Sequence, residues 1–448
     1  MNMSTSKATS DMQQQFHALA DFIATRLQGS ERFTCWFSGE STDFVRFNRG
    51  LIRQPGHVQQ ANLSLSLIDG QRQARGEFSL SGVADIDRER LTRLVEELRV
   101  QLPDLPDDPY LLIATEVQDS TRVVASALPP AGDMVEEILA AAHAHDFVGI
   151  LASGPLFRGF ANSYGQRNWH EIASFNLDFS LYLAGDKAVK SSYAGFDWQG
   201  DAFRARYADA AAQLELLRRP AQRIAPGPCR AYLTPTALSE VIGMLGWGGV
   251  SEKSLRTKYS SLRRMRDEGL RLHPSIQLAE HTAAGLGPAF QPQGFIKAPR
   301  VELIRDGALV GSLISPRTAR EFDLQPNGDE GMDAVELAAG TLPQADVLQA
   351  LGDGVYIGNL WYLNYSDRAS CRMTGMTRFA SFKVEGGEIV APLEVMRFDE
   401  SLYRMLGDKL LGLTRERELL IDSQSYEQRG TGSMLLPGTL VEDFSFVL

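Results

Sequence analysis

The sequence predicts an α+β protein, with an N-terminal α/β part followed by a C-terminal, antiparallel, barrel-like part rich in strands. In the first half, helical and strand patterns alternate, and apolar and polar side chains alternate most regularly over residues 175–183, which is typical of a half-buried strand. In the second half, Asp306-Gly307 and Gly386-Gly387 separate short apolar runs. Such dipeptides favour tight hairpins, which pair antiparallel.

The chain has 448 residues, enough for two or three domains, and we expect three. They are an N-terminal α/β domain (12–103), a middle α/β domain (130–220) and a C-terminal β-rich domain (229–448). Proline-rich stretches near 103–109 and 218–228 separate them as linkers. Residues 1–11 carry no apolar pattern and are expected to be disordered.

In the first domain, apolar residues from Phe16 to Leu27 predict an amphipathic helix. Strands are expected at 33–38, 43–47, 61–68 and 74–80. In the third of these, Leu63, Leu65 and Leu67 alternate with polar residues, and Asp69-Gly70 turns the chain into the fourth. Asp87 is expected to cap a second helix, whose apolar stripe runs from Leu91 to Leu102.

In the middle domain, Asp133 and Glu136 resemble a capping box at the start of a helix. Short strands are expected at 147–152 and 156–162, with Ser153-Gly154-Pro155 as the turn between them. The long strand at 175–183 and another at 188–193 follow, and a helix carrying Ala210, Leu214 and Leu217 ends the domain.

The third domain begins with a strand at 229–233 and a glycine-rich helix over Thr234–Gly249, TPTALSEVIGMLGWGG, which opens with a Thr-Pro helix-start signal. Taken alone, this stretch is typical of a core helix packed tightly on a sheet. Strands are then expected at 300–304, 309–314, 355–363, 378–384 and 388–391.

The composition argues against several classes of protein. A formal net charge of -11 makes nucleic-acid binding unlikely, because such proteins are usually basic. The three cysteines are far apart, which argues against a disulfide framework and favours a cytoplasmic location. The polar first residues do not resemble a signal peptide, and no run of about 18 apolar residues predicts a membrane span.

No complete catalytic motif stands out from the residues alone. The dipeptide His170-Glu171 begins like a zinc-peptidase motif but lacks the second histidine, and the other histidines are scattered. Phosphate-loop, dinucleotide and nucleophile-elbow sequences are missing. The basic run Lys253–Arg271 is the strongest charge feature. We interpret it as a solvated helix or loop face in preference to a site for an acidic partner.

The third domain resembles the TldD/PmbA family, metallopeptidase-related proteins once described as modulators of DNA gyrase. Residues 293–328 carry the resemblance most clearly, with the segments RDGALVGSL and SPRTA, and residues 354–363 and 382–392 (FKVEGGEIVAP) add to it. Weaker likeness extends to the first domain and to FANSYG at 160–165. In TldD-type members an H-E-x-x-x-H helix holds zinc, the glutamate is the general base, and a cysteine near the C-terminus is the third ligand.

In this sequence, the six positions of that motif read SEVIGM. Glu240 matches the general base, whereas Ser239 and Met244 replace the two histidines, and residues 426–440, where the cysteine is expected, contain none. A hydroxyl and a thioether are poor zinc ligands, so no metal site or cofactor is expected in this chain. Without zinc, Glu240 has no bound water to activate. The resemblance therefore implies a divergent, PmbA/TldE-like member.

Our leading hypothesis is a non-catalytic subunit of a TldD/TldE-type zinc metalloprotease that acts on unfolded peptides. The partner would be a TldD-like catalytic subunit, with a homodimer when the chain is alone. A peptide would pair with an exposed strand edge near Tyr356–Tyr362. The alternative is a free-standing peptide- or ligand-binding homodimer unrelated to proteolysis. A third possibility is an enzyme that uses another nucleophile, Cys371 or Ser239.

Overall fold

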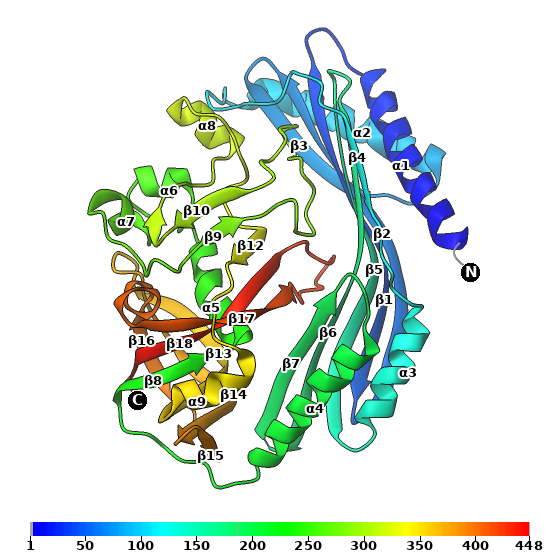
Figure 1. Ribbon diagram of the computed structural model, residues 1–448. Coiled ribbons are helices and arrows are strands. Elements are labelled where there is room, and N and C mark those ends of the chain that lie inside the picture. Colours follow the sequence, from blue (N-terminus) through cyan, green and yellow to red (C-terminus); the bar gives the residue numbers. More distant parts are fainter. Residues whose placement is uncertain (1–2, 186, 448) are drawn as a thin grey trace.

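The computed structural model describes residues 3–185 and 187–447, and it consists of a long curved sheet packed against a second, strand-rich part (Figure 1). The chain is α+β, as expected. Helices α1 to α4 cover one face of the first sheet, and the C-terminal part lies across the opposite face. No helix in the described ranges is long and apolar enough to cross a membrane.

The first sheet has the strand order β3-β2-β1-β5-β6-β4, and β7 also pairs with β6. Its pairs are antiparallel except for β4 with β6. Its strands are β1 (Arg32–Asn48), β2 (Leu51–Asp69), β3 (Arg72–Ser79), β4 (Ser120–Val124), β5 (Asp146–Asn162), β6 (Arg167–Ala184) and β7 (Lys187–Gly195). The segments expected as separate N-terminal and middle domains thus both contribute strands to one sheet.

The two faces of this sheet follow from the alternation of side chains along its strands. Odd-numbered apolar residues such as Phe37 and Phe175 are buried beneath helices α1 (Met3–Ala24), α2 (Ala84–Gln101), α3 (Ala131–Ala142) and α4 (Gly200–Leu216). On β1, β2, β5 and β6 even-numbered residues face the C-terminal part, whereas on β3 the odd-numbered Arg75 does. Most of these are polar, although Leu156 and Ile172 pack against Leu286.

The C-terminal part is built around a closed ring of five strands. Strand β8 pairs with β13, β13 with β14, β14 with β16, β16 with β18, and β18 returns to β8. Most pairings are antiparallel, but β13 with β8 and β12 with β18 are parallel. The expected barrel-like, mainly antiparallel domain is therefore confirmed. Its strands are β8 (Gly227–Leu233), β9 (Leu278–Glu280), β10 (Val301–Arg305), β11 (Ala308–Leu309), β12 (Ala334–Leu337), β13 (Gly354–Asp367), β14 (Arg372–Glu385), β15 (Glu388–Pro392), β16 (Arg397–Ser401), β17 (Leu410–Ile421) and β18 (Ser433–Phe446).

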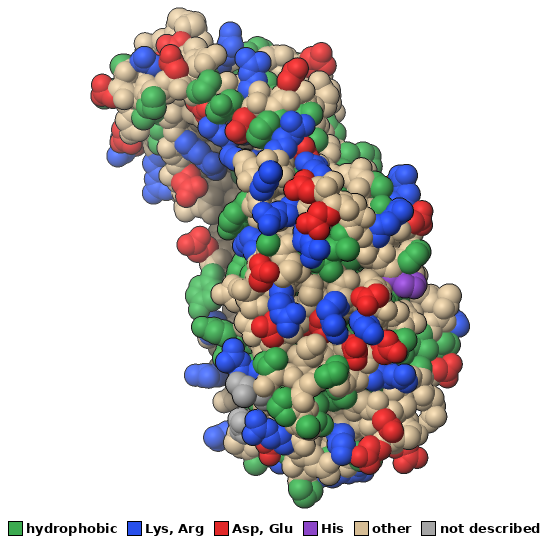
Figure 2. All heavy atoms as spheres, turned by 90° about the vertical axis from the view of Figure 1, so that its left-hand side faces the viewer, with side chains coloured by type: hydrophobic (Ala, Val, Ile, Leu, Met, Phe, Trp, Pro, Cys, Tyr) green, Lys and Arg blue, Asp and Glu red, His purple; other side chains and the backbone are tan. Residues whose placement is uncertain are grey.

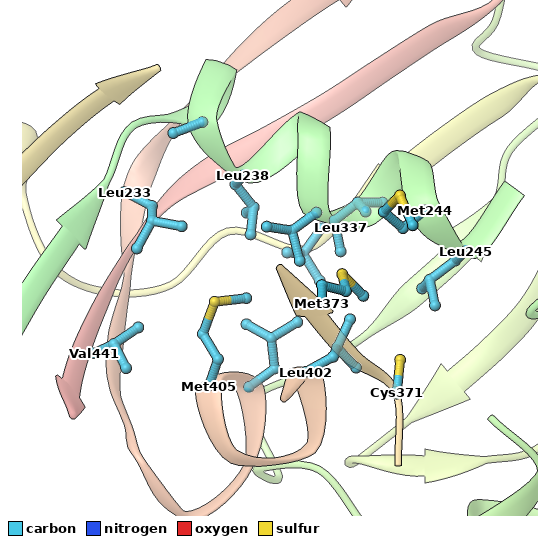
Figure 3. Close-up of a cluster of buried hydrophobic side chains, with 14 of the residues drawn as sticks. Leu233, Leu238, Met244, Leu245, Leu337, Cys371, Met373, Leu402, Met405 and Val441 are labelled. Atoms are coloured by element: carbon cyan, nitrogen blue, oxygen red, sulfur yellow. The ribbon is translucent and has the colours of Figure 1, made fainter. Parts of the chain in front are cut away.

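Helix α5 (Pro235–Gly243) follows β8 and packs against both β13 and β18 of this ring. Its apolar residues belong to the largest core of the protein (Figure 3). The remaining helices of the C-terminal part are short: α6 (Glu252–Arg256), α7 (Arg263–Asp267), α8 (Pro316–Phe322) and α9 (Val347–Leu351).

Several sequence expectations need correction. Residues 3–11 belong to helix α1, whereas Met1 and Asn2 lie outside the described residues. Strand β1 is continuous where two short strands were expected, and so is β5, because residues 153–155 stay paired with β6 and make no turn. Neither expected cap is formed. Helix α3 starts after Pro130, and Asp87 lies inside α2, where it accepts hydrogen bonds from Ser81.

Candidate functional site

The candidate site is the helix α5, whose start follows the predicted signal. The Thr234 side chain accepts a hydrogen bond from the backbone N–H of Ala237, and Pro235 occupies the first helical position. The α-helix ends at Gly243, and one 3₁₀ turn (Met244–Gly246) continues it. The prediction of a helix up to Gly249 is therefore too long. The close packing expected at the glycines of this helix is not seen: a Cβ atom on Gly243 would meet only the Met434 side chain at 3.8 Å, and one on Gly246 would meet no described atom within 4 Å.

The three residues at the zinc-motif positions have separate environments. The Ser239 hydroxyl donates a 2.7 Å hydrogen bond to the Thr236 carbonyl oxygen of its own helix. Met244 is 4% exposed, and its thioether lies in the core (Figure 3). Its side chain is therefore a packing element, and a ligand at this position would have to leave the core.

Glu240 is the most exposed of the three: Ser239 is half-buried and Met244 is buried. Partial burial raises the pKa of its carboxyl, an effect that the ammonium of Lys190 on β7 opposes. Glu240 thus faces the first sheet from α5. Within residues 3–185 and 187–447, no group of three His, Cys, Asp or Glu side chains could hold a metal ion. The residues at the zinc-motif positions therefore do not fit zinc.

The loop between β17 and β18, residues 422–432, includes the start of the tail segment in which the resemblance places a zinc-ligating cysteine. Here the loop carries Arg429, which is 5% exposed and reaches the even-numbered face of the first sheet. Its guanidinium donates hydrogen bonds to the Gly154 carbonyl oxygen at 3.1 Å and to the Ser174 hydroxyl at 2.8 Å. Burial lowers the pKa of Arg429 to about 10, a shift that Glu40 opposes and Arg158 strengthens.

Further buried polar residues hold the same loop. Arg158 on β5 donates to the Arg429 carbonyl oxygen at 3.3 Å. Glu40 on β1 accepts hydrogen bonds from Thr42 and Gln60. These two side chains in turn contact the loop, because Arg429 donates to the Thr42 hydroxyl at 3.5 Å and the Gln60 amide donates to the Glu427 carbonyl oxygen. Sequence reasoning missed this contact zone. The sequence feature that could have indicated it is the series of polar residues at even positions of strands whose odd positions are apolar.

The strand edge proposed near Tyr356–Tyr362 is partly covered. Val355, Tyr356 and Ile357 pair with β8 on one side and with β14 on the other, so the prediction of a free edge is wrong at Tyr356. Beyond Ile357, no described strand pairs with β13 on the β8 side. Irregular register and a positive φ of 59° at Tyr362 interrupt this remaining edge.

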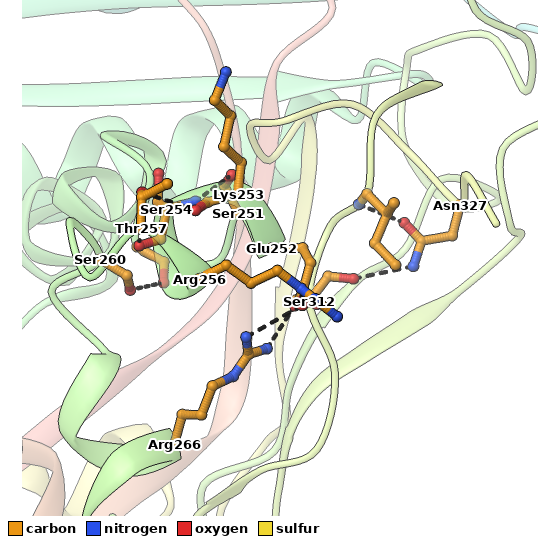
Figure 4. A network of polar contacts seen from close by, with 12 residues as sticks. Ser251, Glu252, Lys253, Ser254, Arg256, Thr257, Ser260, Arg266, Ser312 and Asn327 are labelled. Atoms are coloured by element: carbon orange, nitrogen blue, oxygen red, sulfur yellow. Dashed lines mark hydrogen bonds and ion pairs between the residues drawn. The ribbon is translucent and has the colours of Figure 1, made fainter. Parts of the chain in front are cut away.

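The basic run Lys253–Arg271 forms ion pairs within the protein (Figure 4). The buried Glu252 carboxylate contacts Arg256 at 2.6 Å and Arg266 at 2.5 Å, and it accepts from the Ser312 hydroxyl at 2.6 Å. Burial alone would raise its pKa, but these hydrogen bonds lower it to about 2. Acidic and basic side chains are interspersed over the outer face of the C-terminal part (Figure 2). The run therefore includes a structural network besides its solvated residues.

The other nucleophile and ligand candidates are held in the core. Cys371 is fully buried, and burial raises the pKa of its thiol to about 12, which leaves it protonated and unreactive at neutral pH. His170 is also buried, and its Nε2 atom contacts the Leu286 carbonyl oxygen at 2.9 Å. Neither arrangement resembles a nucleophile with its base.

Comparison with known structures shows the class of fold. The chain is similar to TldE from Thermococcus kodakarensis, with 13% identity and a TM-score of 0.78 over 97% of this chain and 100% of that one. It is also similar to two proposed modulators of DNA gyrase, each at 14% identity and a TM-score of 0.74. The protein from Thermotoga maritima matches over 97% of this chain and 100% of its own, and that from Bacteroides thetaiotaomicron over 100% and 99%. No curated protein matches the sequence.

These matches define the fold as one shared with metallopeptidase-related proteins. Residues 226–447 match the model of the PmbA/TldA metallopeptidase C-terminal domain, which covers α5 and the loop of Arg429. The C-terminal part of the chain, residues 226–447, therefore belongs to the PmbA/TldD family, and the whole chain shares the fold of these solved structures.

Proposed function

We propose that this protein is the non-catalytic, TldE-like subunit of a TldD/TldE-type zinc protease. The observation that supports the proposal most strongly is the state of the zinc-motif helix. Glu240 is retained, but the neighbouring positions hold a serine bonded to its own helix and a methionine packed in the core. A general base needs a metal-bound water or an activated nucleophile, and these residues supply neither.

The loop of Arg429 supports the same reading. In TldD-type relatives the resemblance gives the corresponding tail segment a zinc ligand. In this chain an arginine fixes the loop to the first sheet through Gly154 and Ser174. A buried guanidinium cannot coordinate a cation, and its positive charge disfavours one nearby.

In this proposal, zinc and the cleavage chemistry belong to a TldD-like partner, and no cofactor is needed here. An unfolded peptide would lie against the open part of β13, residues 359–367, where β8 no longer pairs. Exposed Trp361 and Tyr362 lie on this segment and provide apolar contacts for peptide side chains. Alone, the chain would form a homodimer. Its free cysteines suit the reducing cytoplasm.

The test is to purify the untagged chain alone and together with a TldD-like subunit that retains the intact zinc motif. The proposal expects no stoichiometric zinc and no peptide hydrolysis from the chain alone, and a stable complex with zinc-dependent hydrolysis from the pair. One zinc per chain in the lone protein would contradict it. A homodimer that never joins the partner but binds peptides would instead favour the free-standing binding protein.

A further inference from the structure

A pocket of about 390 Å³ lies at the β3 end of the first sheet, away from α5. The strands β1, β2 and β3 form its floor, and helix α8 of the C-terminal part lies across from β3 (Figure 1). The volume is within the range of sites that hold small molecules. Neither the zinc-motif helix nor the loop of Arg429 lines it, so the inference below does not rest on the proposed function.

The floor consists mainly of polar side chains from three paired strands, and these side chains lie on the sheet face opposite the helices. Thr34 on β1 pairs with Ser66 on β2, which in turn pairs with Arg75 on β3. Their odd-numbered neighbours on β1 and β2, such as Leu65, are buried beneath α1 and α2. The alternation that predicted a half-buried strand therefore places hydroxyl and guanidinium groups on the face toward the C-terminal part, with Trp36 beside them.

The walls are partly apolar and come from two separate segments. Residues 110–113 of the linker, Tyr-Leu-Leu-Ile, form one wall, and Pro292 and Gln293 form another. The two segments are joined by a 2.8 Å hydrogen bond from the Ala114 N–H to the Gln293 carbonyl oxygen. The pocket thus has a polar floor and partly aliphatic walls, which suits an amphipathic molecule.

The charges in the lining leave a net positive site. Arg317 is paired with Asp108 at 2.7 Å and lies over the Tyr110 ring, 5.3 Å from its centroid. Arg75 donates through Nε to the Ser64 hydroxyl at 2.9 Å, and no carboxylate of the described residues forms an ion pair with it. Neither Nη group of Arg75 donates a hydrogen bond to another of the described residues, so the pair can bind an anion in a bidentate manner. Because the whole chain has a net charge of -11, which repels anions, this local positive charge marks a place where an anion can bind.

We propose that this pocket binds a small aliphatic carboxylate, with the carboxylate on Arg75 and the hydroxyls of the floor, and the apolar part against residues 111–113. The carboxylate can come from the C-terminus of a short peptide or from a free short-chain acid. A planar carboxylate matches the fork of an arginine, and aliphatic walls favour it over inorganic phosphate.

The experiment is isothermal titration of the full chain with four probes: N-acetyl-leucyl-leucine, the C-terminal amide of the same dipeptide, valerate and inorganic phosphate. We expect the dipeptide acid to bind at least tenfold more tightly than its amide, because the amide cannot make the charged hydrogen bonds. Comparable binding of valerate would identify a free acid as the source, and preference for the dipeptide would identify a peptide end.

Arg75→Gln is the test variant. The side chain is exposed, so its replacement leaves the fold intact, and we expect at least a tenfold loss of affinity for the dipeptide acid. Arg72→Gln is the matched control, because Arg72 lies on the same strand, pairs with Asp107 and does not line the pocket. Equal affinity of acid and amide, no binding at millimolar concentration, equal losses in both variants or tightest binding of phosphate would each overturn the proposal.

Discussion

Replacing Arg429 with methionine tests whether this arginine fixes the loop between β17 and β18. The substitution keeps an apolar side chain in the buried space but removes the guanidinium. The Gly154 carbonyl oxygen and the Ser174 hydroxyl then lose a charged donor inside the protein. Removing one partner of a buried, charged hydrogen-bond network costs about 2–5 kcal/mol. We take about 3 kcal/mol, which corresponds to roughly a hundredfold increase in the local opening constant.

Hydrogen exchange of peptides covering residues 422–434 measures this opening directly, without assuming that the whole chain unfolds in one step. We expect exchange in the Arg429→Met protein to be faster by about two powers of ten. Arg415→Met on β17 is the matched control, because Arg415 is exposed and forms no ion pair with the described residues. If the two variants exchange alike, Arg429 does not hold the loop and the account of this contact zone is wrong.

Three further predictions concern stability, metal binding and assembly. The pKa of Glu252 is lowered to about 2 from its usual 4.5, so its stabilisation is complete above pH 4.5 and is lost as the pH falls toward 2. Glu252→Gln should lower local stability by about 3 kcal/mol at pH 7 and by little near pH 2. The control Lys253→Gln should change it by less than about 0.5 kcal/mol. Hydrogen exchange of residues 250–270 measures both effects. Met244→His should destabilise the C-terminal part by about 2–5 kcal/mol in urea unfolding, because it removes a buried thioether from the core. Combined with Ser239→His it should bind zinc weakly and hydrolyse no peptide in a fluorogenic assay, since the third ligand is still missing. Light scattering of the lone chain should give twice the chain mass, and a monomer at micromolar concentration would contradict the homodimer.

Local patterns predicted many elements of the fold because their causes are local. Thr234-Pro235 starts α5, Asp306-Gly307 forms the β10–β11 hairpin, and the alternation around Leu65 marks a strand with one apolar face. Strand lengths were underestimated. The Ser153-Gly154-Pro155 sequence is typical of a turn, but β6 keeps all three residues paired although Gly154 has a φ of 143°. Tertiary pairing of this kind leaves no local signal.

The identity of the zinc-motif positions could be found from the sequence through the family resemblance. Their environments could not, because burial of Met244 depends on residues that are distant in the chain, such as Leu337 and Met373. The insertion of Arg429 into the first sheet depends on contacts more than 250 residues apart. The polar pocket could not be predicted either, because a strand has the same alternating sequence pattern whether its polar face contacts water or another part of the protein.

Glu240→Ala in the complex with a TldD-like subunit tests the central claim most directly. The assay is cleavage of an unstructured peptide by the complex, compared with the same substitution at the general-base glutamate of the partner. Under the proposed function Glu240 has no metal-bound water to deprotonate, so we predict nearly unchanged cleavage for Glu240→Ala and near-complete loss for the partner's variant. A loss of about a hundredfold or more from Glu240→Ala, the size expected for removing a general base, would contradict the account and make Glu240 catalytic.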